Sequence, residues 1–189
     1  MKRIGTLLIL IAVTATFASR VLPQTASNKK LSEDRTTASL TREIRHQILV
    51  LPFYSVFDFI AFNLEGNRVT LTGYVLRHTL KDHAEAAVRS VEGVDTVVNR
   101  IEILPASASD DELRRAVYRA LYEDSNLAHY AVQNVPPLHI IVKNGSVSLE
   151  GAAESLTEKN LAASRASGAP NVQSVKNNLV VRAKEGTAQ

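Results

Sequence analysis

The feature that most constrains the fold of this chain is an internal repeat with a single offset of 78 residues. Identical residues recur at this offset from a strand-like segment, through a helix-like segment, to a second strand-like segment. The matched pairs are Val69/Val147, Leu71/Leu149, Gly73/Gly151, Thr79/Thr157, Lys81/Lys159, Ala84/Ala162, Val94/Val172, Val97/Val175 and Asn99/Asn177. Solenoid repeats have periods of roughly 20 to 50 residues. The longer offset therefore predicts that one small globular module occurs twice.

A β-hairpin with one apolar face is predicted in the second copy. Asn144-Gly145 favours a two-residue type I′ turn, because both turn positions need a positive φ. The pairs that this turn sets opposite each other are Val142/Val147 and Ile140/Leu149. All four side chains fall on one face of the sheet, since side chains alternate along a strand.

The first copy gives the same result independently. A turn at Gly66-Asn67 produces another hairpin with one apolar face. Its predicted pairs are Leu64/Val69 and Phe62/Leu71, with Glu65/Arg68 beside the turn. Two independent hairpins in equivalent register support the duplication.

Helices and a last strand complete each copy. Apolar residues at helical spacing predict a leading helix at 41–49 and 110–122 and a second helix at 79–94 and 155–170. A last strand beginning at Asp95 or Asn171 is expected to run parallel to the strand before the second helix, by a right-handed crossover. The predicted fold class is α+β. It consists of two tandem αββαβ modules, at residues 39–104 and 109–182, each a small three-stranded mixed sheet packed on two helices.

The beginning of the chain has the pattern of a secretory signal peptide. Lys2 and Arg3 precede an apolar run and a small-residue exit. Residues 4–18 are too few for a spanning helix, which needs about 20 apolar residues. Cleavage is expected after Ala18, which makes residues 1–18 the signal peptide, with a site near Ala26 as the alternative. Residues 19–38 are expected to form a linker and residues 183–189 a tail.

Composition removes several classes of function. The chain has no cysteine, which excludes disulfides and thiol chemistry. It has 22 basic and 19 acidic residues, but Lys2 and Arg3 lie in the signal peptide, so the exported form has 20 basic residues and a net charge of +1. No cluster of Lys and Arg is present, which argues against a nucleic-acid partner.

No catalytic or cofactor motif is present. Phosphate-binding loops, metal-ligand spacings and a nucleophile elbow are all absent from the sequence. Gly73 and Gly151 are interpreted as strand-end glycines that allow close backbone approach, and Asp110 and Asp111 as capping residues at a helix start. The five histidines are expected to be solvated: His46, His78, His83, His129 and His139. We therefore predict that the protein is not an enzyme and that it binds no cofactor, metal or small-molecule substrate.

The two copies resemble the BON domain, a family of exported αββαβ modules. The resemblance rests on a V-x-L-x-G strand and a last strand of the form V-x-x-V-x-N-x-L/I, and it covers residues 39–182. The motif residues are Val69, Leu71, Gly73, Val94, Val97, Asn99 and Ile101, with Val147, Leu149, Gly151, Val172, Val175, Asn177 and Leu179 in the second copy. Asn99 and Asn177 are expected to make a structural hydrogen bond at the final strand. The resemblance implies a non-catalytic periplasmic or envelope protein that binds phospholipid or supports envelope integrity under stress.

The second copy contains an insertion that suggests a binding surface. Leu113 aligns with Leu40 at an offset of 73, so five residues are inserted before the hairpin. The candidate lipid or partner surface consists of Tyr122, Leu127, Tyr130 and Ile141. The alternative, which we favour, is that the segment folds back as a satellite of the core.

Aromatic residues of the first copy face the same two alternatives. They are Phe53, Tyr54 and Phe57. Two functions follow for the whole protein: peripheral binding to a phospholipid membrane surface, or a protein–protein assembly role in the envelope that uses the sheet edges and Ile141.

Overall fold

The structure is a computed structural model that describes residues 25–133 and 135–182, with side chains from residue 36 onward. The predicted signal peptide and tail lie outside the described residues. The described residues from 36 onward belong to one compact unit that contains both copies. Among the described residues, no helix has the length and apolar character needed to cross a membrane.

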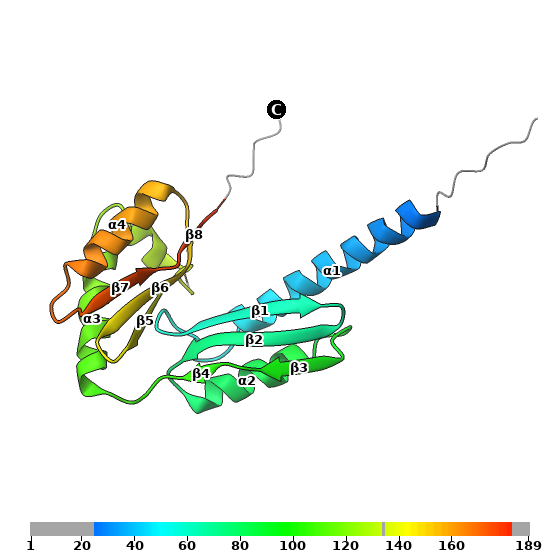
Figure 1. Cartoon of the computed structure of the whole chain (residues 1–189), viewed down its shortest axis with the longest axis horizontal. Coiled ribbons are helices and arrows are strands. Elements are labelled where there is room, and N and C mark those ends of the chain that lie inside the picture. The colour runs from blue at the N-terminus through cyan, green and yellow to red at the C-terminus, as the bar shows by residue number, and fades with distance from the viewer. Residues whose placement is uncertain (1–24, 134, 183–189) are drawn as a thin grey trace, which may run out of the picture. The chain divides into compact units, whose positions relative to one another are not determined.

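Each copy folds as a helix, a hairpin, a second helix and an interrupted last strand (Figure 1). The first module comprises α1 (Thr25–Leu49), β1 (Phe59–Glu65), β2 (Arg68–Val75), α2 (His78–Arg89), β3 (Thr96–Asn99) and β4 (Glu102–Ile103). The second comprises α3 (Ala108–Tyr122), the 3₁₀ helix η1 (Ala128–Val132), β5 (Leu138–Lys143), β6 (Ser146–Ala153), α4 (Leu156–Ser167), β7 (Ser174–Asn177) and β8 (Val180–Val181). The predicted α+β class and its duplication are confirmed.

The predicted hairpin register is also confirmed. β1 pairs with β2 antiparallel, with Leu64 opposite Val69 and Phe62 opposite Leu71. The pairing of β5 with β6 is equivalent, with the cross-strand pairs Val142/Val147 and Ile140/Leu149. The last strand runs parallel to the middle strand in both sheets, as the crossover rule requires.

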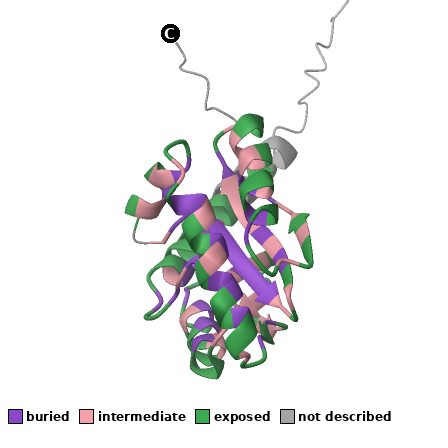
Figure 2. Ribbon diagram, turned by 90° about the vertical axis from the view of Figure 1, so that its left-hand side faces the viewer, coloured by how far each residue is buried: buried purple, intermediate pink, exposed green. Residues whose placement is uncertain are grey.

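The apolar faces meet in one core per module. In the first module, Ile44 of α1 and Ala84 of α2 lie fully buried with Leu71 of the sheet. In the second, Val117 of α3 and Ala162 of α4 lie with Leu149. Buried residues gather on the inner faces of the helices and sheets (Figure 2). The α4 helix buries only alanines, as its thinner apolar face predicts.

The leading helix of the first module is longer than predicted. It begins at Thr25, so most of the range 19–38, which we expected to be a linker, is helical. No glycine or proline occurs between Thr25 and Leu49. Once the residues after 39 are fixed by packing, each further turn adds hydrogen bonds at little cost, because helix propagation is easier than nucleation. A polar sequence without an apolar period concealed this extension.

Candidate binding surfaces

The surface that the insertion suggested is not exposed. Tyr122, Leu127, Tyr130 and Ile141 are all buried. The first three belong to the second module's core, because the inserted segment folds as η1 against α3 and the sheet. The favoured alternative, a segment that folds back onto the core, is confirmed. The candidate lipid or partner surface at these four residues was therefore wrong.

The hydroxyl groups of the two buried tyrosines, Tyr122 and Tyr130, both form hydrogen bonds. The Tyr122 hydroxyl donates to the Leu138 carbonyl at 2.6 Å. The Tyr130 hydroxyl donates to Glu158 at 2.6 Å and accepts from the Glu154 amide at 2.8 Å. Burial, reinforced by Glu158, raises the pKa of Tyr130 to about 12. These hydrogen bonds make burial of the two rings tolerable.

The motif asparagines tie the last strand to the second helix. Asn99 donates to the Lys81 carbonyl at 3.0 Å and accepts from the Ile101 amide at 3.1 Å. Asn177 repeats this arrangement with Lys159 at 2.9 Å. The hydrogen bond that the asparagine accepts lies at the point where the last strand is interrupted, so the role of these residues is structural.

Asp110 has a role that the sequence did not indicate. Ser107 caps α3, and its hydroxyl accepts from the Asp110 amide. The buried Asp110 carboxylate instead accepts from the amides of Asn144 and Gly145, at 2.8 and 2.9 Å. Asp110 lies in the first turn of α3 as predicted, but its side chain does not cap the helix. It fixes the β5–β6 turn, a contact that only the tertiary fold creates.

We expected His139 to be solvated, and this prediction was wrong. Its side chain is buried, with the residue 5% exposed, and its ring lies 5.5 Å from the rings of Tyr54 and Phe59. Burial lowers its pKa to about 4, although the backbone oxygens of Ser55 and Asp58 act in the opposite direction. Its Nδ1 atom has no hydrogen-bond partner among the described residues.

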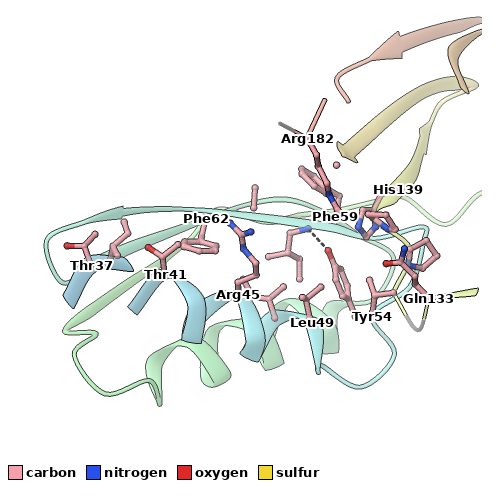
Figure 3. Close-up of a pocket in the computed structure, with 18 residues that line it drawn as sticks. Thr37, Thr41, Arg45, Leu49, Tyr54, Phe59, Phe62, Gln133, His139 and Arg182 are labelled. Carbon is pink, nitrogen blue, oxygen red and sulfur yellow. Dashed lines mark hydrogen bonds between the residues drawn. The ribbon is translucent and has the colours of Figure 1, made fainter. Parts of the chain in front are cut away.

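A groove of about 600 Å³ lies beside β1 and ends at His139 (Figure 3). We call it the β1 groove. The residues that line it are Thr37, Thr41, Arg45, Ile48, Leu49, Tyr54, Phe59, Ile60, Ala61, Phe62, Leu64, Gln133, Val135, Pro136, Pro137, His139, Gly151 and Arg182. One wall is α1, the other is β1, and the segment before β5 closes one end. Among the described residues, the lining is mainly apolar and contains no acidic side chain.

A second feature of the first module is an exposed group of apolar side chains. Leu49, Val50 and Phe53 are 46%, 57% and 69% exposed, and we call this group the apolar corner. Of the three aromatic residues that were open to two interpretations, Tyr54 is buried, Phe57 is half-buried and only Phe53 is exposed. Phe53 has a φ of +67°, a left-handed conformation that is rare for a bulky side chain.

One group of side chains has the composition of a metal site. Ligand atoms of His129, Glu154 and Glu158 lie within 4.8 Å of one another. The hydrogen bonds from Tyr130 and from the Glu154 amide already account for the position of Glu158. Since two of the three side chains are exposed, we assign no metal to this group.

Comparison with known proteins finds one family. A model described as the BON domain matches the chain twice, at residues 37–105 and 109–183. None of the curated proteins matches the sequence.

Some solved structures also match the chain. Two come from CdsD of Chlamydia trachomatis, described as a structural protein of the Type III secretion system. One is 14% identical, covers 78% of this chain and 95% of that chain, and has a TM-score of 0.28. The other, its C-terminal domain, is 15% identical, covers 76% and 98%, and has a TM-score of 0.27. Values this low do not support an argument about fold or function.

Proposed function

We propose that this chain, which belongs to the BON domain family, binds peripherally to phospholipid surfaces in the cell envelope. Membership covers both modules and points to a non-catalytic, envelope-associated protein. The predicted signal peptide at residues 1–18 adds export, and we propose a periplasmic location. Lipid binding there would support envelope integrity or stress tolerance.

The observation that carries the proposal is the apolar corner. Val50 and Phe53 are more than half exposed, and both lie within four residues after Leu49, the last residue of α1. Isolated exposed apolar side chains are common, but these three lie within five residues of the chain, and grouped apolar exposure is typical of an interaction surface. A left-handed Phe53 costs on the order of 1 kcal/mol, and the chain keeps its ring outside the core nonetheless.

Cationic side chains surround the apolar corner. The Arg77 guanidinium lies 5.2 Å from the centre of the Phe53 ring. Arg42 and Arg45 lie seven and four residues before Leu49, on the same side of α1, because a helix has 3.6 residues per turn. All three arginines are exposed. Apolar residues flanked by arginines are typical of helices that bind anionic lipid surfaces, and this local grouping offsets the low net charge.

Replacing the two most exposed side chains of the corner should weaken membrane binding. We expect Val50→Ser combined with Phe53→Asn to lower the partition coefficient on phosphatidylglycerol vesicles by about tenfold. Full burial of such side chains contributes about 1.5–3 kcal/mol each, and insertion at a headgroup boundary recovers part of this. Asparagine is chosen because it tolerates a left-handed φ. Co-sedimentation of residues 19–189 with vesicles at low and high salt measures the effect.

Leu156→Ser is the matched control. Leu156 is 62% exposed but belongs to the second module, so its replacement should leave co-sedimentation unchanged. Circular dichroism should show that every variant is folded. If folded wild-type protein bound neither phosphatidylglycerol nor phosphatidylcholine vesicles, the lipid proposal would be wrong.

The second candidate is an assembly role through a sheet edge. The sequence suggested Ile141 as part of such a surface, but Ile141 is buried. The edge of β1 is a better candidate, because β1 pairs with β2 on one side only and borders the β1 groove. A partner would be detected by the loss of binding when the groove, and not the apolar corner, is changed.

A further inference from the structure

β1 presents hydrogen-bonding groups that nothing in the described structure uses. The Ile60 amide points away from β2, since it donates to the Tyr54 hydroxyl at 3.2 Å. Successive amides of a strand alternate in direction, so the amides of Phe62 and Leu64 point away from β2, as the Ile60 amide does. Neither has a hydrogen-bond partner among the residues described. An edge of this kind is a template for another strand.

The equivalent edge of the second module is occupied by the chain itself. Ile140 is the repeat counterpart of Phe62, and its amide donates to the Val56 carbonyl at 2.8 Å. The segment around Val56 is held by Asp58, whose carboxylate accepts from the Ser55 hydroxyl at 2.6 Å and from the Leu76 amide at 2.8 Å. The described structure therefore contains one edge engaged by a peptide segment and one equivalent edge that no described residue pairs with.

The β1 groove has the shape for such a segment. Phe59, Ile60, Ala61 and Phe62 are consecutive, and since their side chains alternate between faces, the strand's edge borders the groove. In Figure 3 the Arg45 side chain extends from α1 toward β1. The α1 wall runs from residue 37 to residue 49, roughly 18 Å at 1.5 Å per residue. This length suits about five extended residues at ~3.3 Å each.

Charge indicates what the segment carries. Arg45 and Arg182 line the groove, and no acidic residue in the described part of the chain does. Both arginines are exposed, and neither forms an ion pair with a described residue. A carboxylate entering the groove would meet only cationic or neutral groups, and Arg guanidinium groups bind carboxylates in a bidentate manner.

We infer that the β1 groove binds an extended, apolar peptide segment bearing a carboxylate, donated by another envelope protein. The segment adds to β1 as a further strand. Its backbone pairs with the open amides of Phe62 and Leu64, and its carboxylate lies at Arg45. This mode of recognition is β-strand addition. It does not depend on the lipid proposal, because the apolar corner contributes only Leu49 to the groove.

A probe peptide follows from the occupied edge. A capped hexapeptide of sequence YSVFDF, that of residues 54–59, carries the apolar spacing and the carboxylate. Added to residues 19–189, it should slow hydrogen exchange at the Phe62 and Leu64 amides by at least about tenfold near saturation, because strand pairing protects amides. The same peptide with asparagine for aspartate should bind several-fold more weakly. The peptide can also be N-methylated at alternate amides, which removes every second N–H donor. It should no longer bind the protein when the methylated amides are those that would face β1.

Two arginines on α1 provide matched variants. Arg45→Glu should reduce peptide affinity about tenfold or more, since it replaces attraction by repulsion. Arg42→Glu reverses an equally exposed charge that does not line the groove, and it should leave peptide affinity within about twofold. Vesicle co-sedimentation should fall in Arg42→Glu while peptide binding persists, which separates failure of this inference from failure of the lipid proposal.

The outcomes are decisive in both directions. Protection at Phe62 and Leu64, together with selective loss in Arg45→Glu, supports strand addition at β1. Unchanged exchange at these amides, equal losses in the two arginine variants, or no peptide binding at millimolar concentration overturns it.

Discussion

Alanine at Gly73 or Gly151 is expected to destabilise strongly the module that contains it. A Cβ atom at Gly73 would lie 2.0 Å from the Phe59 carbonyl oxygen, and one at Gly151 would lie 2.1 Å from that of Pro137. Both obstacles are backbone atoms of a neighbouring segment, which cannot move as a flexible side chain does. The φ values, +119° and +98°, are also unfavourable for any L side chain.

The expected loss of stability is on the order of 3–5 kcal/mol. It combines strain at positive φ, about 1–2 kcal/mol, with displacement of a paired strand. A domain of this size has a total stability of about 5–15 kcal/mol, so a loss of this size removes a third or more of it when the starting value is below about 10 kcal/mol. Urea denaturation followed by circular dichroism measures the change.

Gly66→Ala is the control for conformational strain. Gly66 has a φ of +59°, but a Cβ atom there would have no neighbour within 4 Å. Its replacement should cost about 1 kcal/mol. Comparable losses in Gly66→Ala and Gly73→Ala would show that close backbone approach is not what Gly73 provides.

The sequence predicted the architecture well because the determining signals are local and were present twice. The turns at Gly66-Asn67 and Asn144-Gly145, together with side-chain alternation, determined the register of both hairpins, and the structure agrees residue by residue. A one-residue slip would have moved Leu71 or Leu149 to the outer face. Duplication acted as an internal check, since each copy predicted the other.

The candidate surfaces were predicted poorly because exposure is a tertiary property. Tyr130 and Phe53 both lie in aromatic segments before a hairpin, yet one is fully buried and the other is 69% exposed. The difference arises from η1, where the inserted residues let Tyr130 reach Glu158. Hydrophobicity alone does not distinguish the two. His139 and the β1 groove depend on segments far apart in the sequence, which periodicity does not register.

Acid should destabilise the protein through His139. The group's pKa is lowered to about 4 in the folded protein, from 6.5, so between these values the unfolded chain binds a proton that the folded chain does not. Stability therefore falls as pH drops through this window and is fully present above about pH 6.5. One pKa unit corresponds to about 1.4 kcal/mol. We expect a loss of about 2 kcal/mol between pH 7 and 4.5 from this residue.

Carboxylates also titrate near the lower limit, so the contribution of His139 is read as a difference between variants. His139→Gln cannot be protonated, and its free energy of unfolding should fall about 2 kcal/mol less than that of the wild type over the same range, by urea denaturation at each pH. His83→Gln, at an exposed position, should follow the wild-type slope. Parallel slopes for wild type and His139→Gln would mean that the imidazole takes up its proton in the folded state, and thus that the contact with Tyr54 and Phe59 opens in acid before the module unfolds.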